Sequence, residues 1–557
     1  MTFVPRPLPR VARRPPHPFD NKLFGLLWWA TFVSNMGTGM HEVTTGWLMA
    51  QLAPTPLMVS LVHSASTLPF FALALPAGAL ADRVNRRHYL LATQAWMMMS
   101  AGLMAWLTWS GLMGPWCLLV CTYLLAVGGA LNSPAWHALT PEIVEPELLP
   151  ASVTYNTAAI NAAKALGPVL GGLLLVGLGP AAVFAANALS FLVVLWVLGC
   201  WKGPPVRAQA AAELFLSAMR VGVQYVRHSP YFLTVIMRSS LFVFITNALW
   251  ALLPLLCQRE FALSGQGYGL AMGLFGLGAV GGALLLLPRL RTAYSTNQIV
   301  VGAWVAFVPV LLAVGWTGQL WLPMLWGGAC WSCILSCCHL AAQSLAPAWV
   351  RARAMSVYLF CFFGSASLGS LFWGYLATGL GLRRCLLVSA ATLTVAALFS
   401  RRACLMTGES FALGTDPHCP QPATADPVPL QHGPIMVTVE YEIDLQDAQD
   451  FRESMERVRR IRYRNGVLQW GLYVDLKDPQ LYREIYVEES WAAHLRQHQR
   501  ITDYDSVVWE RAMCFHRGDG APQVTRLAYC DRTFPLDYGL ASGQPLPARQ
   551  APAWFLN

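Results

Sequence analysis

Long apolar segments constrain this chain more than any other feature of its sequence. A helix needs about 20 mostly apolar residues to cross the hydrocarbon core of a bilayer. In this chain 55% of the residues are hydrophobic and 12% are charged, whereas soluble proteins average about 25% charged residues. This composition excludes an ordinary soluble enzyme and also a disordered chain. We predict twelve membrane helices, near residues 23–50, 56–81, 89–110, 115–138, 151–177, 181–200, 231–256, 266–288, 297–316, 320–343, 354–379 and 385–400.

The charged residues are distributed unevenly along the chain. Lys and Arg outnumber Asp and Glu by 23 to 8 in residues 1–402, whereas the acidic residues lead by 21 to 15 in residues 403–557. With the N-terminus in the cytoplasm, the cytoplasmic side of the membrane part collects 18 basic residues and the opposite side collects 3. This bias follows the positive-inside rule. The sequence therefore predicts a multi-pass membrane protein with both termini in the cytoplasm, and its basic balance requires no nucleic-acid partner.

The membrane part reads as two halves of similar pattern. GALADRVNRR begins at Gly78 after the second apolar segment, and GALLLLPRLR begins at Gly282 after the eighth. Internal repeats of this kind are typical of transporters that place a substrate path between two bundles. We expect a basic N-terminus at 1–22, six-helix bundles at 23–200 and 231–402, a central loop at 201–230, a linker at 403–433, a folded domain at 434–535 and a tail at 536–557.

The loop GALADRVNRR combines a glycine with charges at the edge of the membrane. Gly78 allows two helices to approach closely, and Asp82 and Arg83 lie where a charge pair or a helix-terminus contact is stable. Arg86 and Arg87 extend the basic cluster. We expect this loop to act as a latch whose release lets one bundle move against the other. The alternative is a basic loop that only orients the protein in the membrane.

A second motif, GPVLGG, lies within the fifth predicted helix. Pro168 removes a backbone donor and kinks the helix, while Gly167, Gly171 and Gly172 permit close helix packing. Glycine and proline are also frequent in membrane helices for packing alone. From the residues alone, the motif therefore indicates either a moving element or a close helix contact.

These two motifs resemble signatures of the major facilitator superfamily, namely its loop between helices 2 and 3 and its antiporter motif. Three further segments are similar to the transmembrane secretion effector family: NAAKALGPVLGGLL from Asn161, RARAMSVYLFCFFGSASLGSLFWG from Arg351 and SWAAHLRQHQRITDYD from Ser490. The resemblance extends from about residue 20 to residue 530. It implies a twelve-helix fold of two six-helix halves, a place in the bacterial inner membrane, and proton-coupled export of a siderophore-like cargo.

Three charged residues lie inside the predicted helices, away from their ends: Glu42, Lys164 and Arg238. An unpaired charge at the bilayer centre costs at least about 2.5–3.5 kcal/mol, so such groups usually face a cavity or one another. Lys164 and Arg238 are our candidates for the substrate path, where they would favour an anionic or catechol-rich cargo. Glu42 is our candidate for proton coupling. Its alternative role is a hydrated or paired carboxylate near the end of the first helix.

Histidines and cysteines within the helices offer further candidates. His41, His63 and His339 could share proton coupling, although lone histidines in helices are more often packing residues. Four cysteines at 330, 333, 337 and 338 would suggest zinc in a soluble protein. Inside a membrane helix we interpret them as packing residues, and we expect neither a metal nor a cofactor.

A small folded domain is predicted after the linker. PIMVTVEYEI, VLQWGLYVDL, LYREIYVEES and QVTRLAYCDR alternate as strands, and the segment from Asp444 to Gly466 places Phe451, Met455, Val458 and Ile461 on one helix face. The order βαββαβ predicts a ferredoxin-like cytoplasmic domain. This topology resembles that of the small α+β domains of the antibiotic-biosynthesis monooxygenase type. Self-association and contact with a biosynthetic enzyme are its expected roles.

The sequence thus favours a secondary transporter that exports a small secreted metabolite and is not an enzyme. A multidrug efflux transporter would use the same machinery. Another alternative is a membrane-tethered enzyme, in which His494 and His498 at i and i+4 would form a catalytic or metal-binding pair in the C-terminal domain. A sensor that binds a ligand without transporting it is a third. The absence of a G-x-x-x-x-G-K-[ST] phosphate loop disfavours an ATP-driven pump.

Overall fold

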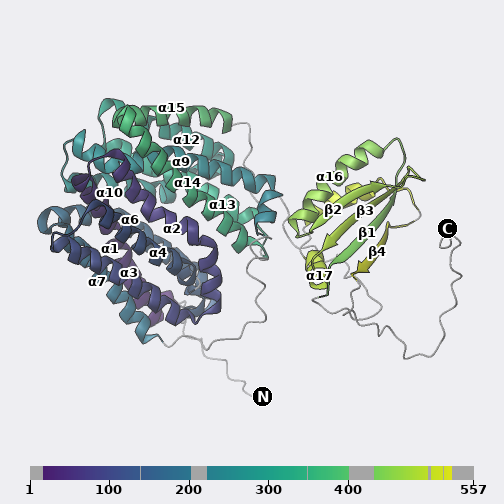
Figure 1. The fold of residues 1–557 in the computed structure, drawn as a ribbon, viewed down its shortest axis with the longest axis horizontal. Coiled ribbons are helices and arrows are strands. Elements are labelled where there is room, and N and C mark those ends of the chain that lie inside the picture. The colour runs from purple at the N-terminus through teal and green to yellow at the C-terminus, as the bar shows by residue number, and fades with distance from the viewer. Residues whose placement is uncertain are drawn as a thin grey trace, which may run out of the picture. The chain divides into compact units, whose positions relative to one another are not determined.

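The computed structural model describes residues 17–137, 139–201, 222–347, 349–400, 432–499, 503–518 and 520–529. The chain forms two compact units, residues 1–411 and residues 412–557. The first unit is helical and the second contains a sheet (Figure 1). Each unit is described by itself.

The helical unit consists of long helices joined by short connections. Polar residues begin several of them: the Asn21 side chain accepts hydrogen bonds from the first backbone N–H groups of α1, and Asn85 does the same for α3. Gly179 and Gly381 end α6 and α14 at φ of 81° and 82°, which an L side chain rarely adopts. The long helices are α1 Lys22–Leu52, α2 Pro56–Arg83, α3 Arg86–Trp109, α4 Pro115–His137, α6 Leu149–Leu178, α7 Pro180–Cys200, α9 Pro230–Arg259, α10 Gly265–Gly281, α12 Thr296–Leu312, α13 Trp321–Leu345, α14 Arg351–Leu380 and α15 Leu382–Ser400.

Shorter helical pieces complete the helical unit. They connect or extend the long helices at both ends of the two bundles. The 3₁₀ and α turns are η1 Pro18–Asp20, α5 Thr140–Ile143, η2 Pro146–Leu148 and α11 Leu287–Ala293, and the π-helical turns are η3 Gly282–Leu286 and η4 Ala313–Thr317.

Within the described residues, 11 helical stretches are long and apolar enough to cross a membrane. Each begins in or next to one of the predicted segments. Helix α1 is 31 residues long but does not belong to this set. It contains Asn35, His41 and Glu42 among other polar residues, which lower its mean hydropathy. That α1 is the twelfth membrane span therefore stays a prediction.

The long helices form two bundles, α1–α7 and α9–α15, whose most extensive contacts with each other are two helix pairs. Helix α2 lies along α14, and α6 lies along α10 (Figure 1). We call the end of the unit that carries Arg86, Arg87, Arg289 and Arg351 the arginine-rich end. The other end, where residues 53–55, 260–264 and 381 connect the helices, is called the opposite end.

The second unit contains a four-stranded antiparallel sheet. Its strands are β1 Ile435–Glu442, β2 Gln469–Val474, β3 Leu481–Glu488 and β4 Gln523–Ala528, in the order β2-β3-β1-β4. Three helices accompany them: α16 Ala448–Arg464, α17 Trp491–Gln499 and α18 Asp503–Met513. The predicted strands and the first predicted helix are found, and the described residues between β3 and β4 include the helices α17 and α18. The ferredoxin-like assignment itself stays a prediction.

One face of this sheet packs on α16. The alternate residues Ile435, Val437, Val439 and Tyr441 of β1 are buried, as period-two alternation requires. Phe451, Met455, Val458 and Ile461 of α16 are buried in the same apolar cluster, which confirms the predicted helix face. The second unit therefore has a hydrophobic core of its own.

A buried ion pair lies inside this core. The Arg462 guanidinium donates to both carboxylate oxygens of Glu484, at 2.8 and 3.2 Å, and stacks over the Tyr486 ring at 4.0 Å. Trp470 Nε1 and the Tyr441 hydroxyl also donate to Glu484. Burial and the adjacent Glu484 carboxylate raise the pKa of Tyr441 well above its usual value, so this phenol stays a donor. All acceptor sites of the carboxylate are thus engaged by the surrounding core.

Replacing one member of this pair should destabilise the second unit more than replacing both. Arg462→Met leaves the Glu484 carboxylate buried without a cation, at a cost of about 3–5 kcal/mol of unfolding free energy. The double variant Arg462→Met, Glu484→Leu should recover most of that loss. Urea unfolding of residues 412–557, followed by tryptophan fluorescence, measures both. The control is Arg459→Met, because the Arg459–Glu456 pair is largely exposed. Equal losses in the single and double variants would contradict this account.

Candidate substrate cavity

A cavity of about 580 Å³ lies within the helical unit, lined mainly by the first bundle. Its size is that of a site for a small organic molecule. Helices α1, α2, α3, α4 and α6 contribute its polar side chains, and α7 adds Phe191 and Val194. The second bundle contributes a mostly apolar wall, made by Trp250, Pro254, Tyr268, Met272 and Phe363. The two bundles therefore present different chemistry to the same space.

Helix α1 provides the longest polar surface of the cavity. Its lining residues recur every three or four positions, so they lie on one face of the helix. Polar residues on one face are stable inside a membrane protein where that face borders a cavity. The polar residues of this stripe recur with a helical period in the sequence. We considered only single charged residues and histidines in the sequence and did not predict the stripe. The stripe is made by Thr31, Ser34, Asn35, Thr38, His41, Glu42 and Thr45.

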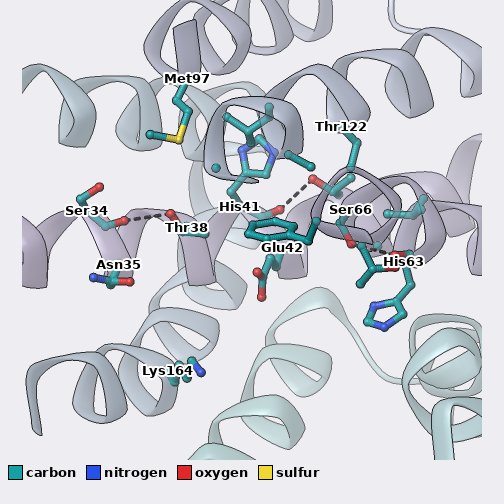
Figure 2. Close-up of a pocket in the computed structure, with 18 of the residues that line it drawn as sticks. Ser34, Asn35, Thr38, His41, Glu42, His63, Ser66, Met97, Thr122 and Lys164 are labelled. Atoms are coloured by element: carbon teal, nitrogen blue, oxygen red, sulfur yellow. Dashed lines mark hydrogen bonds between the residues drawn. The ribbon is translucent and has the colours of Figure 1, made fainter. Parts of the chain in front are cut away.

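Two charged residues line the cavity from different helices. Glu42 comes from α1 and Lys164 from α6, and Figure 2 shows their side chains facing the same space. Both were candidates from the sequence, Glu42 for proton coupling and Lys164 for the substrate path. The structure brings them to one cavity, whereas their roles stay predictions.

Some buried polar atoms at the cavity have no hydrogen-bond partner within the described residues. Both ring nitrogens of His41, the side-chain carbonyl oxygen of Gln94 and the indole N–H of Trp250 are of this kind. His41 is 3% exposed and Gln94 is 4% exposed. Nearly all buried polar groups in proteins are hydrogen-bonded to protein or water. These atoms therefore lack the partner that buried polar groups normally have.

The two bundles are in close contact toward the opposite end. The Ser370 hydroxyl donates to the backbone carbonyl of Ser60 at 2.6 Å, and the Ser64 hydroxyl donates to that of Ser367 at 3.0 Å. Arg259 donates to the carbonyl of Pro54 at 2.5 Å in the connection beyond α1. The lining residues Thr31, Asn132 and Trp136 extend the cavity toward the arginine-rich end. The cavity is thus closed by bundle contact on one side.

The GPVLGG motif lies where α6 meets both α1 and α10. A Cβ atom added at Gly167 would lie 2.9 Å from the Met36 carbonyl oxygen of α1. One added at Gly172 would lie 2.8 Å from the carbonyl oxygen of Gly265 and 3.1 Å from the Cα of Gly269, across the bundle interface. Gly171 faces Met40 of α1 in the same way. The glycines therefore permit a three-helix contact about one to two turns beyond Lys164.

The predicted latch is only partly described. The side chains of Gly78, Asp82 and Arg83 lie outside the described residues. Arg86 forms an ion pair with Glu142 of α5. Arg87 donates to the carbonyls of Leu198 and Gly199 at the end of α7, at 3.3 and 2.7 Å. Glu142, Leu198 and Gly199 belong to the first bundle, so Arg86 and Arg87 attach the loop between α2 and α3 to its own bundle.

Arg238 does not line the cavity, unlike Lys164. It is 4% exposed on α9 and donates to Asn297 Oδ1 at 2.6 Å and to the backbone carbonyl of Ser400. Asn297 is in the first turn of α12, and Ser400 is the last residue of α15. The guanidinium thus joins three helices of the second bundle. Its predicted place on the substrate path receives no support from this geometry.

The remaining histidine and cysteine candidates lie in different parts of the helical unit. His63 lines the cavity from α2, whereas His339 contacts Gln343 on α13, away from it. The four cysteines of α13 are buried, and Cys333 donates to the carbonyl of Gly282 at 3.7 Å. In the part of the chain that is described, no group of three or more His, Cys, Asp or Glu is arranged to hold a metal ion.

In the second unit, His494 is buried within a polar cluster. Its Nδ1 lies 2.5 Å from Glu488 Oε2, and Arg526 Nε donates to its Nε2 at 3.2 Å. The side chain of His498 lies outside the described residues. Both ring nitrogens of His494 are therefore occupied by protein, which gives no support to the paired catalytic site considered above.

Two helical bundles around a polar cavity are the architecture of the major facilitator fold. Solved structures share this architecture. A bacterial homologue of the human lysosomal transporter Spinster, inward-facing and unoccupied, superposes with a TM-score of 0.57 and 13% identity, covering 70% of this chain and 98% of that one. The nucleoside transporter NupG superposes with a TM-score of 0.56 and 14% identity, covering 68% and 99%. At these identities the likeness concerns the fold alone.

The chain belongs to the transmembrane secretion effector family, whose sequence pattern matches residues 14–534. It is 20% identical over 265 residues to the staphyloferrin A transporter of Staphylococcus aureus, covering 47% of this chain and 65% of that protein. It is 19% identical over 240 residues to macrolide efflux protein A of Streptococcus pyogenes, covering 43% and 59%. The chain thus matches less than two thirds of either relative. Its multi-pass membrane fold and its family are those of transporters.

A bulky residue at Gly172 should separate the bundles at the opposite end. Gly172→Val would place methyl groups against the backbone of α10, and overpacking of this kind costs about 1–3 kcal/mol. That cost shifts a two-state equilibrium by roughly 5- to 150-fold. Spin labels on unnatural residues at Thr55 and Ala262, measured by pulsed electron resonance, report the separation.

Gly177→Val is the matched control on the same helix, because nothing lies within 4 Å of its added Cβ atom. We expect the label separation to increase in Gly172→Val and to stay unchanged in Gly177→Val. The same separation in both variants would refute the role given to the glycine contact.

Proposed function

We propose that this protein is a secondary active exporter of a small secreted metabolite, siderophore-like in chemistry, in the bacterial inner membrane. The observation that carries the proposal is the cavity in which Glu42 and Lys164 face the same space. A carboxylate and an ammonium group inside a membrane protein mark a path for protons and charged substrates. The similarity to the staphyloferrin A transporter supports a secreted, metal-binding type of cargo.

Coupling to protons follows from competition at Glu42. A cargo that donates hydrogen bonds to Glu42 favours the ionised carboxylate and so releases a proton toward the cytoplasm. On the other side of the membrane, a proton that binds Glu42 displaces the cargo. Lys164 holds an acidic group of the cargo from the time the cargo binds until it is released. This exchange moves protons inward as cargo leaves.

Alternating access uses the bundle interface described above. The arginine-rich end faces the cytoplasm under the positive-inside rule, so the described state accepts cargo from inside. The contact of Gly172 with α10 then opens while the arginine-rich end closes. Arg86 and Arg87 keep the loop between α2 and α3 attached to the first bundle during this movement.

The proton role of Glu42 predicts a specific loss in Glu42→Gln. Glutamine keeps the shape of the side chain but cannot release a proton, so flux driven by a pH gradient should fall about ten-fold or more, the usual size of a coupling between sites. Proteoliposomes with staphyloferrin A as the probe measure this flux. Glu42→Asp is the control that keeps a carboxyl group. Unchanged pH-driven flux in Glu42→Gln would remove Glu42 from the mechanism.

Multidrug efflux is a second candidate, favoured by the apolar wall of Trp250, Tyr268 and Phe363 and by the similarity to macrolide efflux protein A. Lys164 separates the two. Lys164→Met should weaken binding of the acid 2,3-dihydroxybenzoate by about ten- to 100-fold, because a hydrogen bond to a charged group is lost. Titration calorimetry on the full chain in nanodiscs measures this change. Tight binding of erythromycin to both forms, with no binding of the acid to either, would favour multidrug efflux.

We place the acidic C-terminal unit in the cytoplasm, as the even number of predicted spans requires. Its compact core supports a role as a contact module, either between copies of the chain or with an enzyme that makes the cargo. Transport is assigned to the helical unit, because the cavity and both of its charged residues lie there.

A further inference from the structure

Six hydroxyl groups at the cavity share one arrangement. Each of the six donates its proton to a backbone carbonyl three or four residues earlier in its own helix. Thr31, Thr38 and Thr45 of α1 donate to Leu27, Ser34 and His41 at 2.6, 3.0 and 2.8 Å. On α2 and α4, the same is true of Ser66, Thr67 and Thr122, at 2.9, 2.9 and 2.7 Å. Figure 2 shows the bond from Thr38 to Ser34 and the Ser66 bond.

This arrangement decides what the cavity surface offers a ligand. A hydroxyl has one proton and two lone pairs. To donate to a ligand, each of these groups would have to break its bond within the helix, whereas to accept from a ligand it gives up nothing. The oxygens of these six hydroxyl groups therefore act as hydrogen-bond acceptors toward the cavity.

The other side chains extend this acceptor character. One amide proton of Asn35 is used by the Thr31 carbonyl at 2.8 Å. The Gln94 amide donates to Asn132 Oδ1 at 3.4 Å, and its buried carbonyl oxygen has no partner. The ionised Glu42 carboxylate accepts only. The cavity also has donors, among them the Lys164 ammonium group, the indole N–H of Trp250 and the hydroxyls of Ser34 and Tyr268. Of these, the Lys164 ammonium group is charged and therefore suits an acidic group of a ligand.

We propose that the cavity selects a cargo rich in hydrogen-bond donors that also carries one acidic group. Several hydroxyl, phenol or amide N–H groups of the cargo would donate to the oxygens of α1, α2 and α4, and its acidic group would accept from Lys164. A polyhydroxylated or polyphenolic acid has this pattern. The inference rests on the proposed function in one respect only, namely that this cavity is the transport site.

A matched pair of probes isolates the donors. Gallate, which is 3,4,5-trihydroxybenzoate, and 3,4,5-trimethoxybenzoate share the ring, the carboxylate and the three oxygens, but methylation removes the three donors. Binding is measured by titration calorimetry on the full chain in nanodiscs. We expect gallate to bind about ten-fold or more tightly than its methylated analogue, as one or two satisfied hydrogen bonds allow.

Variants then test which oxygens accept. Thr38→Val with Thr45→Val removes two lining oxygens at nearly constant shape and should reduce the preference for gallate to about three-fold or less. Thr38→Ser with Thr45→Ser keeps the oxygens and should keep the preference. Thr44→Val is the matched control, because Thr44 is buried on α1 and donates to Met40 but does not line the cavity.

Three results would overturn the inference: equal or tighter binding of the methylated probe, no binding of either probe, or a Thr44→Val effect as large as that of the lining pair. Efflux of gallate from proteoliposomes is measured in parallel. A retained gallate preference without efflux would refute the proposed export function but leave the donor preference of the cavity in place.

Discussion

The polar groups inside this protein depend on one constraint: in lipid, hydrogen bonds must be satisfied by protein or by enclosed water. Helix α1 meets it in an ordered way. Its threonine hydroxyls are bonded to the helix's own backbone, so they can stand at a cavity without an external donor. Glu42 and Lys164 approach the cavity from different helices, so the cavity contents can supply hydrogen bonds to both. The threonine hydroxyls keep a partner within their own helix whatever fills the cavity.

Close approach of backbones gives the cavity its closed side. Gly167 and Gly171 bring α6 against α1 within the first bundle, and Gly172 brings it against α10 of the second. Because the same six-residue motif serves both contacts, the position of α6 relative to α1 and to α10 is set together. Lys164 is about two turns from Gly172 on the same helix, so a change in the α6–α10 contact also changes the surroundings of the ammonium group. This connection links the interface to the binding site through one rigid helix.

Much of the fold could be predicted from the sequence, because apolar length and period are strong signals in a membrane protein. The spans after the first, the strands and the buried face of α16 follow directly from them. The first helix shows the limit of the method: its polar stripe lowers its hydropathy, although that stripe has a clear helical period. The site was predicted only in part. Lys164 and Glu42 could be found because charges in apolar segments are conspicuous.

Arg238 was not distinguishable from Lys164 in the sequence. Both are single cations in apolar helices, and only the packing shows that one reaches the carbonyl of Ser400 while the other lines the cavity. The contributions of Trp250 and Tyr268 were equally hidden, because aromatic residues are abundant throughout the chain and their exposure to a cavity is a tertiary property. Pair partners such as Glu142 for Arg86 depend on tertiary packing in the same way.

The reciprocal serine bonds between α2 and α14 have a consequence for the speed of movement. Ser370 and Ser64 each donate to a carbonyl on the facing helix, so sliding or parting of these helices uncovers two carbonyl oxygens and two hydroxyl protons at once. Each such bond contributes about 0.5–1.5 kcal/mol net when water can replace it, and much more when it cannot. Water that enters the widening gap therefore lowers the energy barrier to the movement of α2 against α14. Without water in the gap, the barrier would be high and the movement slow.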